Sequence, residues 1–190
     1  MDNLDSDIKN ISKSLSDKQR DFDAVMGLVR DTVRNSAQTI TMLHNNDSGG
    51  ATKTLKEAEK MVKSLKNFDS VFEYHAKQAY QEYAEAKIFF EIKQHDVIPT
   101  YAKTGVDQES YIMGLMDVMG ELKREIFEAL RDGKLNLAEG YFKKMTTIYD
   151  STRSIRFAEA VLNGFRRKQD VARIQLEGAG SELLSFKSKV

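Results

Sequence analysis

Residues 55–90 read LKEAEKMVKSLKNFDSVFEYHAKQAYQEYAEAKIFF, and this stretch decides the fold class. Its apolar side chains recur at steps of three, four or seven from Leu55 to Phe90, which is the pattern of an amphipathic helix. No proline or glycine interrupts the pattern as far as about His95. The spacing therefore predicts a single helix of about forty residues in this part of the chain.

Helical periodicity also covers the chain on both sides of this stretch. We predict a long helix from about residue 5 to 45 and, after a loop over residues 96–107, a helix that Asp107 or Ser110 could cap. This helix should stop at Asp132-Gly133. Three further helical pieces are expected: one capped by Asn136, one from about residue 154 to 164, and one from about residue 166 to 185.

The composition agrees with an all-α chain that forms one domain over residues 1–190. One proline and eleven glycines are too few for the frequent turns of a sandwich or barrel. The absence of cysteine excludes disulfides, thiolate nucleophiles and cysteine-ligated metal sites. The acidic N-terminus lacks the apolar stretch of a secretion signal, and no run of about 18 apolar residues could cross a membrane. We therefore expect a cytoplasmic protein with no membrane partner.

The length of the predicted helices bears on assembly. A helix of forty residues spans about 60 Å, which exceeds the width of a globule of 190 residues. The apolar stripes should therefore extend beyond the core of one subunit, and association with further copies would cover them. The alternative is that the helices are kinked and fold back within one subunit.

Two pairs of acidic residues on predicted helices are candidates for a metal site. Glu82 and Glu85 lie three residues apart, and Asp117 and Glu121 lie four apart, so each pair occupies one face of its helix. If the two helices face each other, four carboxylates converge, and such crowding needs a cation. Oxygen ligands suit Mg²⁺ or Mn²⁺. Gly120 would let another group approach the helix backbone closely.

Other interpretations of the acids and histidines compete with this site. Each acidic pair alone could be a solvated helix face. A carboxylate-bridged di-iron bundle needs a Glu-x-x-His motif on two helices, and the sequence has none. His44 falls at a helix end, where either ring nitrogen could bond to a terminal carbonyl group. Three histidines without cysteine give little support for a nucleophilic triad.

Basic residues gather in two places. Between residues 153 and 173, six basic residues stand against two acidic ones, which could form a phosphate-binding strip. The candidates for nucleic-acid contact in this strip are Arg166, Arg167, Lys168 and Arg173. A second candidate set on the first helix comprises Arg20, Arg30 and Arg34. The alternative for the strip is an ordinary charged helix start that pairs with nearby acids.

The same residues carry a resemblance to a known family. The two acidic pairs, the string RRKQDVAR at residues 166–173, the segment LVRDT at residues 28–32 and Leu43-His44 resemble the translin/TRAX family. The similarity extends over about residues 17–184. It implies an all-α bundle of about seven helices that assembles into a closed, roughly octameric shell around single-stranded RNA. In that family, TRAX-type subunits are metal-dependent endoribonucleases and translin-type subunits mainly bind nucleic acid.

The four matching acids indicate the nuclease-competent, TRAX-like branch. The resemblance then implies a homo-oligomeric endoribonuclease for single-stranded RNA, with single-stranded DNA as a second candidate ligand. Its catalytic and metal-binding residues would be Glu82, Glu85, Asp117 and Glu121, holding Mg²⁺ or Mn²⁺. The sequence departs from the family at Ala37 and Asn45, where basic residues are expected. The alternatives are a non-catalytic shell that binds RNA or DNA and a helical scaffold without nucleic acid.

Overall fold

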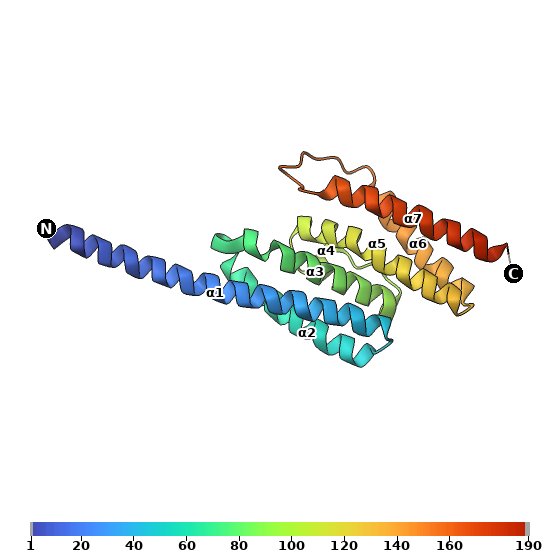
Figure 1. Ribbon diagram of the computed structural model, residues 1–190, viewed down its shortest axis with the longest axis horizontal. Coiled ribbons are helices and arrows are strands. Elements are labelled where there is room, and N and C mark those ends of the chain that lie inside the picture. Colours follow the sequence, from blue (N-terminus) through green and yellow to red (C-terminus); the bar gives the residue numbers. More distant parts are fainter. Residues whose placement is uncertain (1, 189–190) are drawn as a thin grey trace.

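The computed structural model describes residues 2–188, and within this range it consists of seven α-helices and one short 3₁₀-helix (Figure 1). The α-helices are α1 (Asp2–His44), α2 (Ser48–Leu65), α3 (Asp69–His95), α4 (Tyr101–Thr104), α5 (Gln108–Arg131), α6 (Leu135–Thr152) and α7 (Phe165–Lys187), and the 3₁₀-helix η1 spans Lys66–Phe68. Because α4 is a single turn, six helices build the bundle. The predicted all-α fold class is confirmed.

The prediction of one helix over residues 55–95 is wrong, because the chain forms α2, turns at η1 and returns as α3 (Figure 1). A 3₁₀ turn requires neither glycine nor proline, so the sequence carries no breaker there. Leu65 and Phe72 are buried on either side of the turn, and the Tyr80 hydroxyl donates to Asp69 Oδ1 at 2.6 Å. Folding back lets α2 and α3 both pack against α1, which one straight helix could not do.

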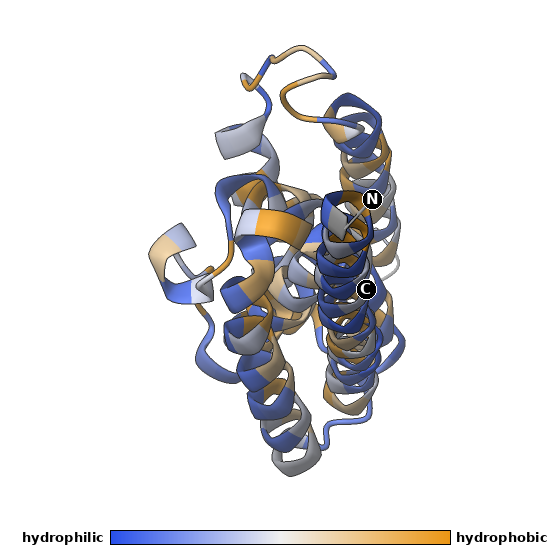
Figure 2. Cartoon of the chain, turned by 90° about the vertical axis from the view of Figure 1, so that its left-hand side faces the viewer, coloured by the Kyte–Doolittle hydropathy of each residue, from blue (hydrophilic) through white to orange (hydrophobic). Residues whose placement is uncertain are grey.

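Two smaller predictions are also wrong. Residues 153–164 form an irregular loop of turns, at the top of both views (Figure 1, Figure 2). Phe157 and Val161 are exposed in this loop, so a helix there would have no core to pack against. Asn136 lies inside α6, which begins at Leu135. The predicted cap of α5 is confirmed, since the Asp107 carboxylate accepts the backbone N–H of Ser110 at 3.0 Å.

The packing order places α3 and α5 at the centre of the bundle. Helix α1 packs against α2 and α3, α3 packs against α5, and α5 packs against α6 and α7. One hydrophobic cluster runs through these contacts. None of the helices between residues 2 and 188 combines the length and the apolar character that crossing a membrane requires.

The N-terminal half of α1 projects from the bundle (Figure 1). Every residue from 3 to 21 is exposed. The projection nevertheless carries an apolar stripe at helical spacing, formed by Leu4, Ile8, Ile11 and Leu15. From Val25 to Leu43 the same helix packs against the rest of the subunit. The apolar face of α1 is therefore covered by its own subunit only from about Val25 onward.

Candidate active site

The helices that carry the two acidic pairs, α3 and α5, face each other, as the metal-site hypothesis required. Gly114 permits their close approach. A Cβ at this position would lie 2.8 Å from the Cβ of Ala84 and 2.9 Å from the backbone nitrogen of Glu85. The two backbones therefore meet directly beside one acidic pair and one helical turn before Asp117. Gly114 was not among the predicted site residues, although an isolated glycine inside a helix often marks a place of close packing.

The four acids influence one another electrostatically. Burial, followed by the negative charges of Asp117, Glu82 and Glu121, raises the pKa of Glu85 to about 8, while Lys168 acts in the opposite direction. Burial and the charge of Asp117 also raise the pKa of Glu82. The charged forms of these acids are disfavoured in the folded protein, and a bound cation would stabilise them.

Two of the four acids are engaged by other side chains of the chain. Asp117 forms an ion pair with Lys168 of α7 and accepts a hydrogen bond from the Gln81 amide at 2.7 Å. Glu121 contacts His44, at the end of α1, at 2.5 Å. In this arrangement no three His, Asp or Glu side chains within residues 2–188 come close enough together to hold a metal ion.

The chemistry of the four acids nevertheless fits a hard divalent cation. All the donors are carboxylate oxygens, which Mg²⁺ and Mn²⁺ prefer. Among residues 2–188 no side chain forms a hydrogen bond that affects the pKa of Glu82 or of Glu85, so both carboxylates can take an external ligand. The Lys168 ammonium supplies at Asp117 the positive charge that a metal ion would bring.

His44 does not bond to a helix-terminal carbonyl group, which corrects that sequence prediction. Its Nδ1 contacts Glu125 Oε1 at 2.6 Å, and its Nε2 contacts Glu121. The terminal carbonyl of Leu43 instead accepts a hydrogen bond from Lys93 Nζ at 2.8 Å. Lys93 also pairs with Glu125 Oε2 at 2.9 Å. These residues are brought together by the tertiary fold, and nothing in their sequence spacing indicates the network.

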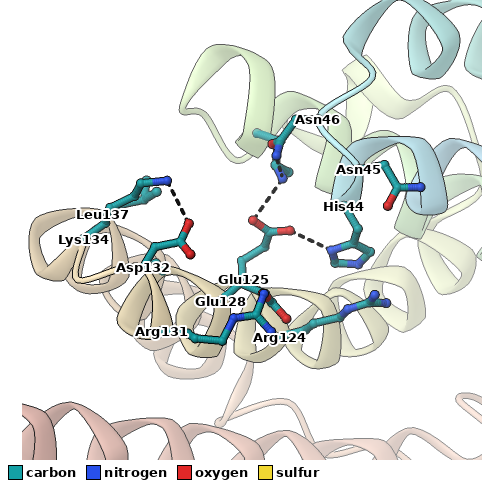
Figure 3. A pocket seen from close by; sticks show the side chains of 12 residues that line it. His44, Asn45, Asn46, Arg124, Glu125, Glu128, Arg131, Asp132, Lys134 and Leu137 are labelled. Atoms are coloured by element: carbon teal, nitrogen blue, oxygen red, sulfur yellow. Dashed lines mark hydrogen bonds and ion pairs between the residues drawn. The ribbon is translucent and has the colours of Figure 1, made fainter.

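The network borders a polar cavity of about 360 Å³. Figure 3 shows His44 and Glu125 pointing toward each other from α1 and α5 at this cavity. Its wall also carries basic and acidic side chains from α5 and the α5–α6 turn, namely Arg124, Glu128, Arg131, Asp132 and Lys134. Arg131 and Lys134 form ion pairs with Glu128 and Asp132. Most charge at the cavity is therefore balanced within the chain.

The basic residues at the start of α7 lie beside the acids. Arg167 and Lys168 border a pocket of about 420 Å³ together with Asp117 and Gln175. Gln175 is the group that approaches Gly120, because its Nε2 lies 3.2 Å from the place of a Cβ there. The predicted close approach thus comes from the protein itself. Arg166 is exposed, and Arg173 pairs with Glu177 at 3.0 Å.

The second basic set lies elsewhere in the subunit. Arg20, Arg30 and Arg34 are all exposed on α1. Arg20 pairs with Asp17, and Arg34 pairs with Asp31 at 3.0 Å. Helices α3 and α5 stand between α1 and α7, so the two basic sets do not form a continuous strip within one subunit (Figure 1).

Comparison with known proteins gives one relative of similar sequence. No protein-family model matches the chain. The uncharacterized protein MJ0175 of Methanocaldococcus jannaschii is 31% identical over 176 residues, which cover 90% of this chain and 79% of that protein.

Several solved structures have the same fold, and three C3PO structures are among them. The structure of AfC3PO in complex with duplex RNA has a TM-score of 0.88 at 22% identity, and the crystal structure of AfC3PO has a TM-score of 0.86 at 24% identity. Both matches cover 96% of this chain and 97% of the other. Apo-NeC3PO has a TM-score of 0.85 at 19% identity, covering 94% and 96%. The chain therefore has the C3PO fold, as its resemblance to the translin/TRAX family predicted.

Proposed function

This chain belongs to the same family as the Methanocaldococcus jannaschii protein and has the translin/TRAX-like fold of the C3PO structures, and from this premise we propose that it is a metal-dependent endoribonuclease. Its substrate is single-stranded RNA, held inside a homo-oligomeric shell. The proposal is carried by the four carboxylates on the facing helices α3 and α5, beside the basic start of α7. Among residues 2–188 they are too far apart to hold an ion in this arrangement, but they are close enough that burial and the charges of the other three raise the pKa of Glu85 to about 8.

In this proposal the acids of α3 and α5 form the reaction centre. Glu82, Glu85, Asp117 and Glu121 hold Mg²⁺ or Mn²⁺. The bound ion supplies Lewis-acid polarisation of the scissile phosphate and activation of water, so that no side-chain nucleophile is needed. Glu85 gives up its proton when it becomes a ligand.

The basic residues of α7 bind the RNA backbone. Lys168, once released from Asp117, is free to neutralise a phosphate next to the reaction centre. Arg166, Arg167 and Arg173 neutralise further phosphates, which gives little base specificity and an affinity that falls as salt rises. Contacts from Arg20, Arg30 and Arg34 come from other subunits of the shell, because these residues lie on the far side of α3 and α5 in their own subunit.

Assembly follows from the projecting half of α1. Leu4, Ile8, Ile11 and Leu15 are each more than half exposed in the single subunit. A second copy of the chain offers the same stripe and would cover it. We propose an octamer, in line with the translin/TRAX resemblance. A closed shell would admit flexible single strands more readily than stiff duplex, and because AfC3PO was solved with duplex RNA, both substrates need testing.

A second function is favoured by a specific observation. Asp117 and Glu121 already contact the cationic Lys168 and the buried His44, and no metal-holding group exists among residues 2–188 in this arrangement. If a cation does not displace Lys168 from Asp117, the acids serve packing, and the protein is a non-catalytic shell that binds RNA.

One experiment separates these functions. End-labelled single-stranded and duplex RNA are incubated with the full chain in Mg²⁺, in Mn²⁺ and in chelator. Shortening in metal with intact RNA in chelator supports the nuclease. RNA that is bound but intact in all conditions supports the non-catalytic shell, and absence of binding at low salt contradicts both. Light scattering on the same sample should give a mass several times 21.6 kDa, and a monomer would contradict the enclosed chamber.

A further inference from the structure

His44 contacts one of the four acids, Glu121, and also residues outside that group. The ring lies between two carboxylates of α5, at 2.5 Å from Glu121 and 2.6 Å from Glu125. It also packs against Phe89 of α3, with the ring centroids 5.0 Å apart. Only 5% of the His44 side chain is exposed. Side chains of α3 and α5 thus fix the ring at the C-terminal end of α1.

The two ring nitrogens of His44 have different partners. Nδ1 faces Glu125 Oε1 and Nε2 faces Glu121 Oε2, so the ring is held from both sides by side chains of α5. Together with the packing on Phe89, these contacts fix one ring orientation.

The contacts of Lys93, Glu125 and His44 form a chain that ends at Glu121, one of the proposed metal ligands. Lys93 is anchored to the Leu43 carbonyl and pairs with Glu125, which accepts from Nδ1 of His44. The opposite nitrogen, Nε2, contacts only one oxygen of Glu121, Oε2. Within the described chain, the other oxygen of Glu121 has no contact to His44 or to a basic side chain. This second oxygen is the one available to a cation.

We propose that His44 is a positioning residue that holds the Glu121 carboxylate in the orientation in which it binds the metal ion. The inference rests on the proposed metal site and adds a residue that contacts neither the metal nor the RNA. Partners of this kind, one step behind a metal ligand, typically contribute 10- to 100-fold in metal affinity or activity. A purely structural role for His44, which would join the end of α1 to α5, makes a different prediction.

Two substitutions separate these roles, because each keeps one half of the network. In His44→Gln the longer amide places its donor near the position of Nε2, so the hydrogen bond to Glu121 is retained and the one to Glu125 is removed. In His44→Asn the shorter amide places its donor near Nδ1, so only the hydrogen bond to Glu125 is retained. His95→Asn is the matched control, because His95 forms a similar hydrogen bond to Glu91, at 2.7 Å, away from the acids.

The measurements use the full chain. Mn²⁺ affinity is measured by electron paramagnetic resonance without RNA, RNA affinity in chelator, and cleavage as a function of Mg²⁺ concentration. We expect His44→Asn to weaken Mn²⁺ binding by about 10- to 100-fold and to raise the Mg²⁺ requirement similarly. His44→Gln and His95→Asn should remain within a few-fold of the parental protein, and RNA affinity in chelator should not change.

Equal Mn²⁺ affinity in His44→Asn and His44→Gln would overturn the inference, whatever happens to their thermal midpoints. If His44→Asn does not fold, Glu125→Leu replaces it. This change removes the contact to Nδ1 and leaves the contact of Nε2 to Glu121, so stability should fall while Mn²⁺ affinity stays within a few-fold of the parental value. A loss of Mn²⁺ affinity of about 10-fold would show that the joining of α1 to α5 sustains the site, and it would contradict the positioning role. A parental protein that neither binds Mn²⁺ nor cleaves RNA would instead contradict the proposed function itself.

Discussion

Glu85 and Glu125 are both poorly exposed acids on facing helices, yet their environments act on them in opposite directions. Burial raises the pKa of Glu125, but hydrogen bonds from His44 and Lys93 outweigh it and leave the pKa lowered. Glu85 meets three other carboxylates, and its pKa is raised to about 8. Glu125 is satisfied within the chain, whereas Glu85 needs positive charge from outside. The difference separates a structural ion network from a ligand site.

Glu121 lies on the boundary between these two regions. It is one helical turn from Glu125 on α5 and shares His44 with it. It also contributes to the raised pKa of Glu85. Helix α5 therefore carries Glu125, which belongs to the structural ion network, and one turn earlier Glu121, which is a proposed metal ligand. Substitutions on the two sides should have different signatures, and the following predictions use that contrast.

The largest expected effect is on catalysis. Glu85→Gln should reduce Mg²⁺-dependent cleavage of single-stranded RNA by about 10³-fold or more, since a catalytic metal supplies several kcal/mol of transition-state stabilisation. The same variant should be as stable as the parental protein in chelator, or more stable, because it removes repulsion among the acids. Glu73→Gln, at an exposed position of the same helix, is the control.

Parental cleavage rates would contradict the nuclease assignment if they were found in all four variants of the cluster. These variants are Glu82→Gln, Glu85→Gln, Asp117→Asn and Glu121→Gln. If the acids serve packing instead, the variants should lose stability both with and without metal.

The opposite signature is expected in the ion network. Glu125→Ala should lower the free energy of unfolding by about 3 kcal/mol, because it leaves the buried charges of His44 and Lys93 without their partner. Urea unfolding in chelator, at one fixed protein concentration, measures the loss. A change no larger than that of Glu85→Gln would remove the distinction between the two regions.

Much of the fold could be predicted from the sequence, because amphipathic periodicity reports which face of each helix is buried. The cap at Asp107 and the extents of α1 and α7 follow from such local signals. The reversal at Lys66–Phe68 does not, because a 3₁₀ turn leaves the apolar spacing intact. Only the packing of α2 and α3 on the same helix favours it, and that packing is a tertiary effect.

The candidate site divides in the same way. Spacing alone placed each acidic pair on one helix face, but it could not show that α3 and α5 face each other. That pairing depends on Gly114 and Ala84, which touch across the two helices. His44 and Glu121 are separated by 77 residues, so their contact depends on where α1 ends relative to α5. The residues that hold a functional group are thus harder to predict than the group itself.

A smaller effect concerns pH. The pKa of Glu85 in the folded protein, about 8, lies above the ordinary value of 4.5. The folded state therefore binds more protons than the unfolded state between these values, and stability in chelator should fall as pH rises through this window. Glu85→Gln should flatten the fall, and saturating Mg²⁺ should reduce it.

Thermal midpoints from pH 5 to 8.5 test this prediction. The raised pKa of His44 produces a fall of the same sign, so the difference between parental protein and Glu85→Gln isolates Glu85. A difference that does not change with pH would show that Glu85 titrates normally, and the distinction from Glu125 would then disappear.

The smallest expected effect is on RNA affinity, and it concerns the arginines at the start of α7, which lie beside the four acids and not beside the ion network. Replacing Arg166 and Arg167 with Gln should weaken RNA binding in chelator equally for all RNA sequences. The slope of log affinity against log salt concentration should decrease by about one unit for each phosphate that is no longer neutralised. Arg173 should contribute less, because Glu177 already pairs with it. The matched comparison is the triple replacement of Arg20, Arg30 and Arg34, which lie on α1, far from the acids in the same subunit. If replacing the α1 set reduces the salt dependence of RNA binding more than replacing the α7 set does, the RNA lies away from the carboxylates. If the α7 variant keeps the parental salt dependence but no longer forms the oligomer, the α7 arginines serve assembly.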